Sequence, residues 1–163
     1  MESLLAAGAE TEAADTGTGQ TSLLIASENG NIKIKALLAA GANVNTKAND
    51  GWTPLLVACL RGNLRVVKTL LAAGADIEVT DTDTGQTSLL IASEQGHIAM
   101  VETLLAAGAE INRRADDGRT ALHLACARRH WVVQGLLLDA GADPDTRAHN
   151  DMTPLHLMCS KGD

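Results

Sequence analysis

A segment of about 33 residues recurs along this chain, and this internal period constrains the fold more than any other feature. A threonine opens each copy, at spacings of 32, 34, 33 and 33 residues: Thr21, Thr53, Thr87, Thr120 and Thr153. A glycine within an Ala-Gly-Ala triplet repeats at a similar period: Gly8, Gly41, Gly74, Gly108 and Gly141. Chains of this kind fold as stacks, because one unit cannot bury its apolar face alone.

Each copy divides into two short helices and a polar loop. Threonine is a preferred residue before a helix, and Pro54 and Pro154 follow it at the first helical position, where a missing N–H costs nothing. A glycine such as Gly62 allows the turn into a second helix with apolar residues at helical spacing. The Ala-Gly-Ala glycine then suits the left-handed residue that ends this helix. The dozen residues that follow are rich in Asp, Asn, Thr and Gly, and they predict turns.

Segments close to the motif elements Asp-Gly-Xaa-Thr-Pro-Leu-His-Leu-Ala, Gly-His, Val-Val, Leu-Leu and Gly-Ala-Asp follow one another in this order, and the closest matches span 50–76 and 117–143. This pattern resembles the ankyrin repeat. The resemblance implies an all-α fold, an ankyrin-repeat solenoid of antiparallel helix pairs with projecting β-hairpin loops. We expect one repeat domain, 1–163, in which four full repeats lie between two half repeats: 1–15, 16–47, 48–81, 82–114, 115–147 and 148–163.

Three places depart from the common repeat. The second helix of the first full repeat is one residue short at 32–36. A deletion inside a helix would rotate all later side chains by about 100°, so we expect this helix to begin one residue later. Residues 81–84 hold an extra residue in their hairpin loop. Arg129 stands where other copies have the turn glycine, and Asp151 stands at the hairpin glycine.

The resemblance implies that a protein or peptide partner binds a concave groove of hairpin tips and first helices. The side chain before each cap threonine and the end of each first helix map onto this groove, at Gln20, Trp52, Leu60, Arg61, Gln86, Glu94, Arg119, Arg128 and Met152. Trp52, Leu60 and Arg61 fall in one repeat, and exposed Trp, Arg and apolar side chains together are typical of interface hot spots. The alternative is that Trp52 folds onto its own hairpin as a structural plug.

Charge along this groove is graded by sequence position. Acidic Glu28, Asp83 and Glu94 lie toward the N-terminal half, and the C-terminal half carries Arg119, Arg128, Arg129 and Lys161. The gradient favours a partner with an acidic segment near the C-terminal repeats, and the alternative is an ordinary solvated face. Trp131 occupies the second-helix position of Leu64 and Ile98, so we expect it in the core.

Possible metal sites have simpler structural interpretations. His123-Xaa-Xaa-Cys126 and His156-Xaa-Xaa-Cys159 offer four zinc ligands on paper. The resemblance implies instead that this histidine hydrogen-bonds the hairpin backbone and that cysteine replaces a small core residue. Residues 81–85 lack the downstream Glu of a calcium loop, and turn-forming aspartates are the better interpretation. We predict no metal and no cofactor; Asn hydroxylation at Asn45 and Asn112 stays open as a family-level possibility.

Composition narrows the class of partner. The formal net charge of −7 disfavours nucleic acid and anionic membranes, and the apolar runs are far shorter than the roughly 20 residues that span a bilayer. Three cysteines without a disulfide framework indicate reduced thiols in the cytoplasm or nucleus. Because no nucleophile elbow or phosphate-binding glycine loop occurs, we predict a non-catalytic interaction scaffold and not an enzyme.

The two ends carry interior-type residues where a polar capping face is usual: Leu4, Leu5, Leu155, Leu157 and Met158. One interpretation is a fragment of a longer array, and a designed or trimmed chain is another. A third is that the terminal half repeats complement each other between copies, giving a homo-oligomer. The alternative to partner binding is therefore a structural or spacer array that stacks on further repeats or on other copies.

Overall fold

The computed structural model describes residues 10–30 and 33–160. These residues form helices α2 (Ser22–Glu28), α3 (Ile34–Ala39), α4 (Pro54–Leu60), α5 (Leu64–Ala72), α6 (Ser88–Gln95), α7 (Ile98–Ala106), α8 (Ala121–Ala127), α9 (Trp131–Asp139) and α10 (Pro154–Ser160). The all-α prediction is confirmed. No helix in this part of the chain is long and apolar enough to cross a bilayer. The chain packs as two compact units: unit 1, Met1–Asp76, and unit 2, Ile77–Asp163.

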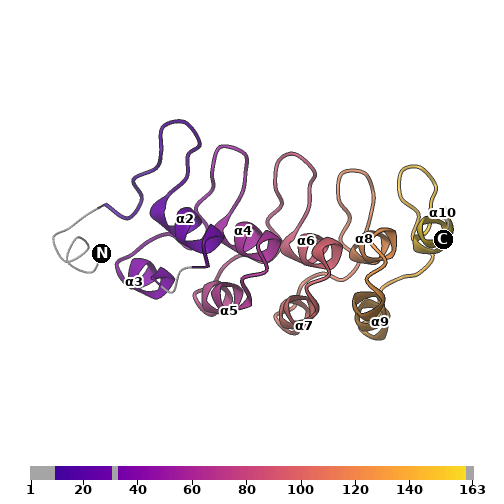
Figure 1. Ribbon diagram of the computed structural model, residues 1–163. Helices are drawn as coiled ribbons and strands as arrows, with labels where there is room; N and C mark the ends of the chain where they lie inside the picture. The colour runs from indigo at the N-terminus through magenta and orange to yellow at the C-terminus, as the bar shows by residue number, and fades with distance from the viewer. Residues whose placement is uncertain (1–9, 31–32, 161–163) are drawn as a thin grey trace. The chain divides into compact units, whose positions relative to one another are not determined.

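Unit 1 contains two helix pairs. Helix α2 packs against α3 and α4 against α5, while α2 also packs along α4 and α3 along α5 (Figure 1). Polar loops project on the side of the first helices that faces away from the second helices. The core between these helices consists of aliphatic side chains that are at most 5% exposed: Leu23, Leu24, Ile34, Leu37, Leu55, Leu56, Val66, Val67 and Leu70.

Unit 2 repeats this arrangement. Helix α6 packs on α7 and on α8, α8 packs on α9 and on α10, and α7 packs along α9. Its core uses mostly the same repeat positions: Leu89, Leu90, Met100, Val101, Leu104, Leu122, Val133 and Leu137. Ile91 and Leu124 are buried as well, at a position where unit 1 has the exposed Ile25 and the half-buried Val57. Each such side chain contributes about 1.5–3 kcal/mol when it leaves water, so stability is distributed over many similar contacts.

A small residue lies in the middle of each of four first helices. Ala58, Ala92 and Ala125 are fully buried, and Ala26 is 8% exposed. Because alanine has no atoms beyond Cβ, it lets a neighbouring helix of the same unit approach closely. This explains how a chain with two tryptophans and no Phe or Tyr still forms a dry core.

The threonines begin the first helices as predicted. Thr21, Thr53, Thr87 and Thr120 are the N-cap residues, and each is buried. The Thr53 hydroxyl accepts a hydrogen bond from the Leu56 N–H at 3.3 Å. One backbone bond closes each preceding loop, as in Ala48 N to Trp52 O at 2.9 Å. The projecting loops are therefore hairpin turns without paired strands in the described residues, apart from one isolated bridge between Ala14 and Thr21.

The departures from the common repeat have local consequences. Helix α3 has six residues where α5 has nine, and both end two residues before their Ala-Gly-Ala glycine. The shortage therefore falls at the start of α3, the end that was predicted, but α3 begins three residues later than α5 in the repeat register and not one. Residues 31–32 lie outside the described residues. Arg129 (φ 60°) and Asp151 (φ 58°) are the non-glycine residues with positive φ in the described chain. Both keep the left-handed backbone of the glycines they replace, at the cost of Cβ strain.

Candidate functional site

The structure places the predicted groove residues at the edge of the core. The residue before each cap threonine is half-buried in all five copies: Gln20, Trp52, Gln86, Arg119 and Met152. At the ends of the first helices, Leu60 and Glu94 are half-buried, and Arg61 and Arg128 are exposed. We name these nine residues the recognition surface after their predicted role; Gln20, Trp52, Leu60 and Arg61 are its part in unit 1, and the others are its part in unit 2.

In unit 2 a hydrogen-bonded chain links three members of this surface. Gln86 Nε2 donates to Glu94 Oε2 at 3.3 Å, and Arg128 Nη2 donates to Glu94 Oε1 at 2.7 Å. Arg128 Nε donates to the same oxygen at 3.3 Å. The Gln86 side chain therefore reaches across its own first helix, α6, to Glu94 in the last turn. Glu94 in turn binds Arg128 of the next repeat.

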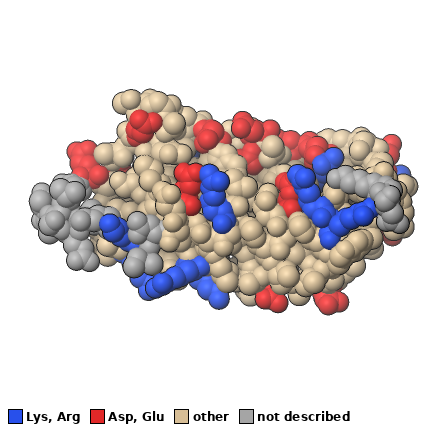
Figure 2. Space-filling view, viewed as in Figure 1, with Lys and Arg blue, Asp and Glu red and all other residues tan. Residues whose placement is uncertain are grey.

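Unit 1 has the equivalent ion pair. Arg61, which follows α4, pairs with Glu28 at the end of α2. Figure 2 shows a basic and an acidic group in contact on this face of each unit. By sequence position these charges were interpreted as a gradient, and their pairing was not predicted. The signal was present, because Glu28 and Arg61 are 33 residues apart and Glu94 and Arg128 are 34 apart, close to the repeat period.

In unit 2 the other two members of the surface, Arg119 and Met152, belong to the hairpins. Arg119 pairs with Asp117 of its own loop at 3.3 Å, and the Met152 carbonyl closes the next loop by accepting from Ala148 N at 3.0 Å. Both C-terminal arginines of the surface thus have a carboxylate partner inside unit 2. An acidic partner at Arg119 and Arg128 stays a prediction, and it must compete with these pairs. Lys161 lies outside the described residues.

His123 makes the backbone contact expected of it. Its Nε2 lies 3.0 Å from the Met152 carbonyl, and its Nδ1 lies 2.9 Å from Thr120 Oγ1 and 3.2 Å from Thr120 N. Burial lowers the pKa of His123, and the bond to Met152 opposes that shift only in part. Both ring nitrogens are engaged in holding one hairpin to the next, which leaves no lone pair for a metal ion.

Cys126 lies in the core, where the resemblance predicted that cysteine replaces a small residue. Its side chain is 3% exposed, and burial raises the pKa of this thiol to about 11. A protonated, buried thiol is a poor nucleophile and a poor metal ligand. Cys159, its counterpart on α10, is exposed.

Asp81 organises the longer hairpin loop of unit 2. It is 4% exposed, and its carboxylate accepts from Asp83 N (2.9 Å), Thr84 N (2.6 Å), Thr84 Oγ1 (2.8 Å) and Gln86 N (3.1 Å). In unit 1, Asp15 accepts from the hydroxyl and the N–H of Thr18, and these bonds lower the pKa of Asp15. Both carboxylates are used within their own loops, so the turn-forming interpretation is confirmed.

The arrangement of capped helix pairs and linked loops matches a known family. The family described as "Ankyrin repeats (3 copies)" matches residues 1–81 and 79–148, most of the chain. The chain belongs to the ankyrin repeat family. Repeats of this family are protein–protein interaction domains.

Three curated ankyrin-repeat relatives illustrate the similarity. The nuclear factor NF-kappa-B p105 subunit of Mus musculus is 44% identical over 75 residues, which are 45% of this chain and 8% of that protein. The B-cell lymphoma 3 protein homolog of Mus musculus is 40% identical over 74 residues, 45% of this chain and 16% of that protein. The mitochondrial disaggregase of Homo sapiens is 49% identical over 49 residues, 30% of this chain and 7% of that protein. The chain thus spans less than a fifth of the length of each relative. The activity that the name of the mitochondrial disaggregase states is therefore not attributed to this chain.

The ankyrin loops are tied together by a polar ladder inside each unit. In unit 1, Glu12 accepts from Asn43 N at 2.8 Å and Asn45 accepts from Asp76 N at 2.8 Å. In unit 2, Glu78 accepts from Glu110 N at 2.8 Å and Asn112 accepts from Asp143 N at 2.9 Å. Each side-chain oxygen comes from the residue four positions after an Ala-Gly-Ala glycine. Asn45 and Asn112 therefore have a structural role.

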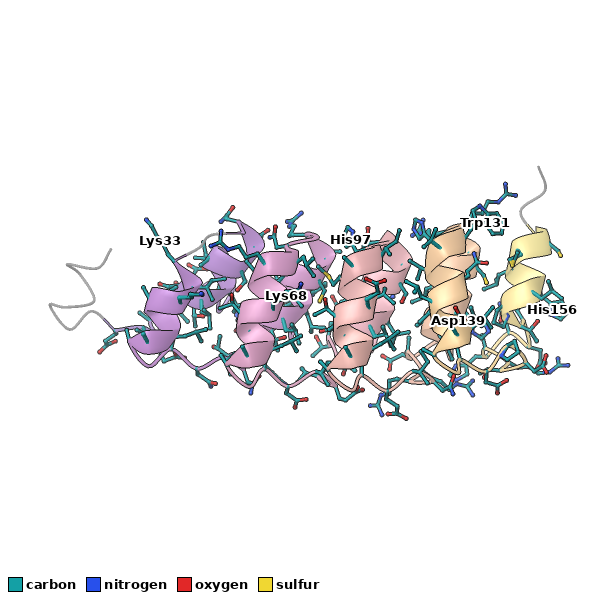
Figure 3. All side chains as sticks on the ribbon, turned by 90° about the horizontal axis from the view of Figure 1, so that it is seen from below. Lys33, Lys68, His97, Trp131, Asp139 and His156 are labelled. Atoms are coloured by element: carbon teal, nitrogen blue, oxygen red, sulfur yellow. The ribbon has the colours of Figure 1, made fainter. Side chains whose placement is uncertain are left out.

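One placement predicted from the ankyrin pattern is wrong. Trp131 was expected in the core, but its side chain is 58% exposed at the start of α9 (Figure 3). The alignment with Leu64 and Ile98 is correct, and the error lies in what that position does. Leu64 is half-buried and Ile98 is 42% exposed, so the position ten residues before the Ala-Gly-Ala glycine lies outside the core in α5, α7 and α9.

Proposed function

We propose that this chain is a non-catalytic interaction scaffold that binds a protein or peptide partner through the recognition surface. The observation that carries the proposal is that the packed repeat positions keep similar residues from copy to copy, whereas the recognition-surface positions differ. The five residues before the cap threonines share one half-buried position, yet they are two glutamines, a tryptophan, an arginine and a methionine. Packing does not require such variety, whereas selection of one partner does.

Trp52 and Leu60 are the proposed centre of binding in unit 1. They occupy the repeat positions of Gln86 and Glu94, whose side chains meet at 3.3 Å in unit 2. By this equivalence, we propose that the Trp52 ring extends along α4 toward Leu60 and Arg61. Trp52 is half-buried, so part of its ring remains available to a partner. A half-buried aromatic beside an apolar group and an arginine is the usual composition of a hot spot.

The loops that carry these side chains are held before any partner arrives. In unit 1 the loop of Trp52 is tied to the preceding loop by Asn49 N to Thr18 O at 3.0 Å. In unit 2 the loop of Arg119 is tied by Asp116 N to Thr84 O at 3.0 Å. A surface fixed in this way loses little conformational entropy on binding, which favours affinity.

The cytoplasm or nucleus remains the proposed location.

Affinity capture from a cell extract tests the proposal. The native chain and the Trp52→Ala, Leu60→Ala double variant are immobilised at equal density, and bound proteins are compared by mass spectrometry. The proposal expects at least one protein retained by the native chain and lost from the double variant, with both chains equally helical by circular dichroism. Identical sets of bound proteins would contradict it.

Exposed apolar side chains on the last helices favour a second candidate function, a spacer that stacks on further repeats or on other copies. Leu155 of α10 is 65% exposed, and Val132 and Leu138 of α9 are 58% and 47% exposed. Leu157 is buried and Met158 half-buried, while Leu4 and Leu5 lie outside the described residues. Sedimentation at several concentrations tests self-association, and Leu155→Glu is expected to abolish it. A mass that stays monomeric at every concentration would contradict self-association, the part of this candidate in which copies of the chain stack on one another.

A further inference from the structure

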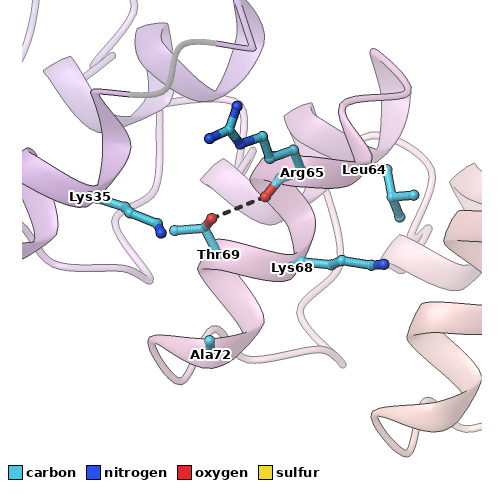
Figure 4. Close-up of a pocket in the computed structure, with 6 residues that line it drawn as sticks. All are labelled: Lys35, Leu64, Arg65, Lys68, Thr69 and Ala72. Atoms are coloured by element: carbon cyan, nitrogen blue, oxygen red, sulfur yellow. Dashed lines mark hydrogen bonds between the residues drawn. The ribbon is translucent and has the colours of Figure 1, made fainter.

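A hollow of about 450 Å³ covers the outer side of α5 in unit 1, away from the recognition surface. Its lining residues are Lys35 from α3 and Leu64, Arg65, Lys68, Thr69 and Ala72 from α5. Figure 4 shows Lys35 extending toward Thr69, whereas Lys68 leaves α5 on the other side. The two ammonium groups therefore flank the exposed surface of one helix. We call these six residues the basic face.

The cations of this face are not compensated by carboxylates. Lys35, Arg65 and Lys68 are all exposed, and none takes part in an ion pair with another described residue. Helices α3 and α5 contain no Asp or Glu. In Figure 2, basic groups gather along the lower edge over α3 and α5. Three uncompensated cations on one face stand out in a chain whose formal net charge is −7.

The position in the repeat shows that this charge is local to unit 1. Lys35 and Lys68 both lie six residues before an Ala-Gly-Ala glycine, so consecutive repeats present an ammonium group at the same place. The same position in α7 is Glu102, and Gly135 occupies it in α9. The frame of the repeat therefore does not require a cation there.

The shape of the basic face indicates the kind of ligand. Its lining runs from Leu64 to Ala72, the full length of α5, which is about 12 Å at 1.5 Å per residue. Leu64 and Ala72 add apolar surface among the charges, and the Thr69 hydroxyl is already used in a 3.0 Å bond to the Arg65 carbonyl. An isolated phosphate binds compactly, commonly at backbone N–H groups. A long face with separated cations and apolar surface fits a polypeptide segment better.

We propose that the basic face binds an acidic peptide segment of a partner protein. Carboxylates of the segment pair with Lys35, Arg65 and Lys68, and one of its apolar side chains packs on Leu64 and Ala72. Complementary charge of this kind speeds association and selects acidic partners. The site is a second binding surface, separate from the recognition surface, so this chain can hold two protein segments at once.

Fluorescence anisotropy of the full chain with a labelled 12-residue peptide of glutamates and two leucines tests the proposal at low salt. The test variant is Lys35→Glu with Lys68→Glu. Its matched control is Lys47→Glu with Arg113→Glu, which changes the net charge equally at exposed positions elsewhere. We expect about tenfold weaker binding for the test variant and less than about twofold for the control. Equal effects of the two variants, or none, would overturn the proposal.

Further arms separate the other possible occupants. A peptide with both leucines replaced by serine should bind several-fold more weakly, and unchanged binding would contradict the apolar contact. Inorganic phosphate should compete no better than chloride of equal ionic strength, and selective competition would reassign the face to phosphate. Self-association that Lys35→Glu with Lys68→Glu abolishes would reassign it to a second copy of the chain. The Trp52→Ala, Leu60→Ala variant should bind the peptide normally, so failure of the two proposals can be told apart.

Discussion

The guanidinium of Arg128 lies 2.7 Å from the carboxylate of Glu94, a residue of the preceding repeat in the same unit. The Arg128 side chain is 56% exposed and that of Glu94 is 20% exposed, so water screens much of the attraction. The pair therefore contributes more to the pattern of the recognition surface than to stability. It offers a partner one fixed carboxylate and one fixed guanidinium instead of two mobile charges.

A double-mutant cycle measures this contribution. We expect a coupling free energy below about 1 kcal/mol from the urea unfolding of Glu94→Ala, Arg128→Ala and the double variant. Asp139→Ala with Arg147→Ala, exposed residues of the same unit, provides the uncoupled reference. A coupling of several kcal/mol would mean that the pair holds the repeats together, contrary to this interpretation.

Arg129→Gly is expected to stabilise the protein. Arg129 has φ 60°, a backbone region that glycine adopts without Cβ strain, so the free energy of unfolding should rise by about 1 kcal/mol. The neighbouring substitution Arg128→Gly is the control. Because Arg128 has φ −99° and an ion pair, glycine there should lower stability. Chemical denaturation shows whether each variant raises or lowers the free energy of unfolding. A lower free energy of unfolding in Arg129→Gly would contradict backbone strain at Arg129.

Asp81→Ala is expected to destabilise unit 2 by about 2 kcal/mol or more. The change removes an acceptor of four short hydrogen bonds and leaves N–H groups of a closed loop without partners. Asp83→Ala in the same loop alters an exposed side chain whose backbone N–H is retained, and it should change stability by less than about 0.5 kcal/mol. Thermal denaturation of the two variants should differ clearly, and equal effects would refute the role given to Asp81.

The burial of His123 predicts lower stability in mild acid. Its pKa in the folded protein is lowered, so the unfolded chain takes up a proton near pH 6.5 before the folded chain does. Stability from this group is therefore present above about pH 6.5 and is lost as the pH falls below that value. The measurement is the free energy of unfolding in urea between pH 8 and pH 5.

Two histidine variants isolate this effect. His123→Gln should lower stability at pH 8 but flatten its fall toward pH 5, because the titrating ring is gone. His149→Gln, at an exposed position of the same unit, is the matched control substitution. A pH profile of His123→Gln with the native slope would show that another group causes the loss.

The fold could be predicted because its rules are local and repeated. Threonine caps, turn glycines and the Ala-Gly-Ala helix ends each act within a few residues, and five copies show which features are structural. The same comparison identified Arg129 and Asp151 as irregular, and they are the positions with strained φ.

The parts that were not predicted depend on which residues meet between repeats. The pairing of Glu28 with Arg61 requires the stacking of α2 on α4, so it shows only when consecutive repeats are compared at the repeat period and not from either helix alone. The exposure of Trp131 was not predicted because a hydrophobic pattern gives the type of residue at a position and not how deeply that position is buried. The recognition surface itself remains a prediction, because the packing of the repeats does not depend on which side chains occupy the positions of that surface.

The most direct test of partner binding compares the two tryptophans. Isothermal titration with the captured partner measures the dissociation constant for the native chain, Trp52→Ala and Trp131→Ala. The loss of a hot-spot aromatic costs about 2 kcal/mol, so Trp52→Ala should bind roughly 30-fold more weakly. Trp131→Ala removes an equally large but more exposed ring outside the recognition surface and should bind within about twofold of the native chain. Equal affinities for the native chain and Trp52→Ala, or a greater loss in Trp131→Ala, would contradict the proposed surface.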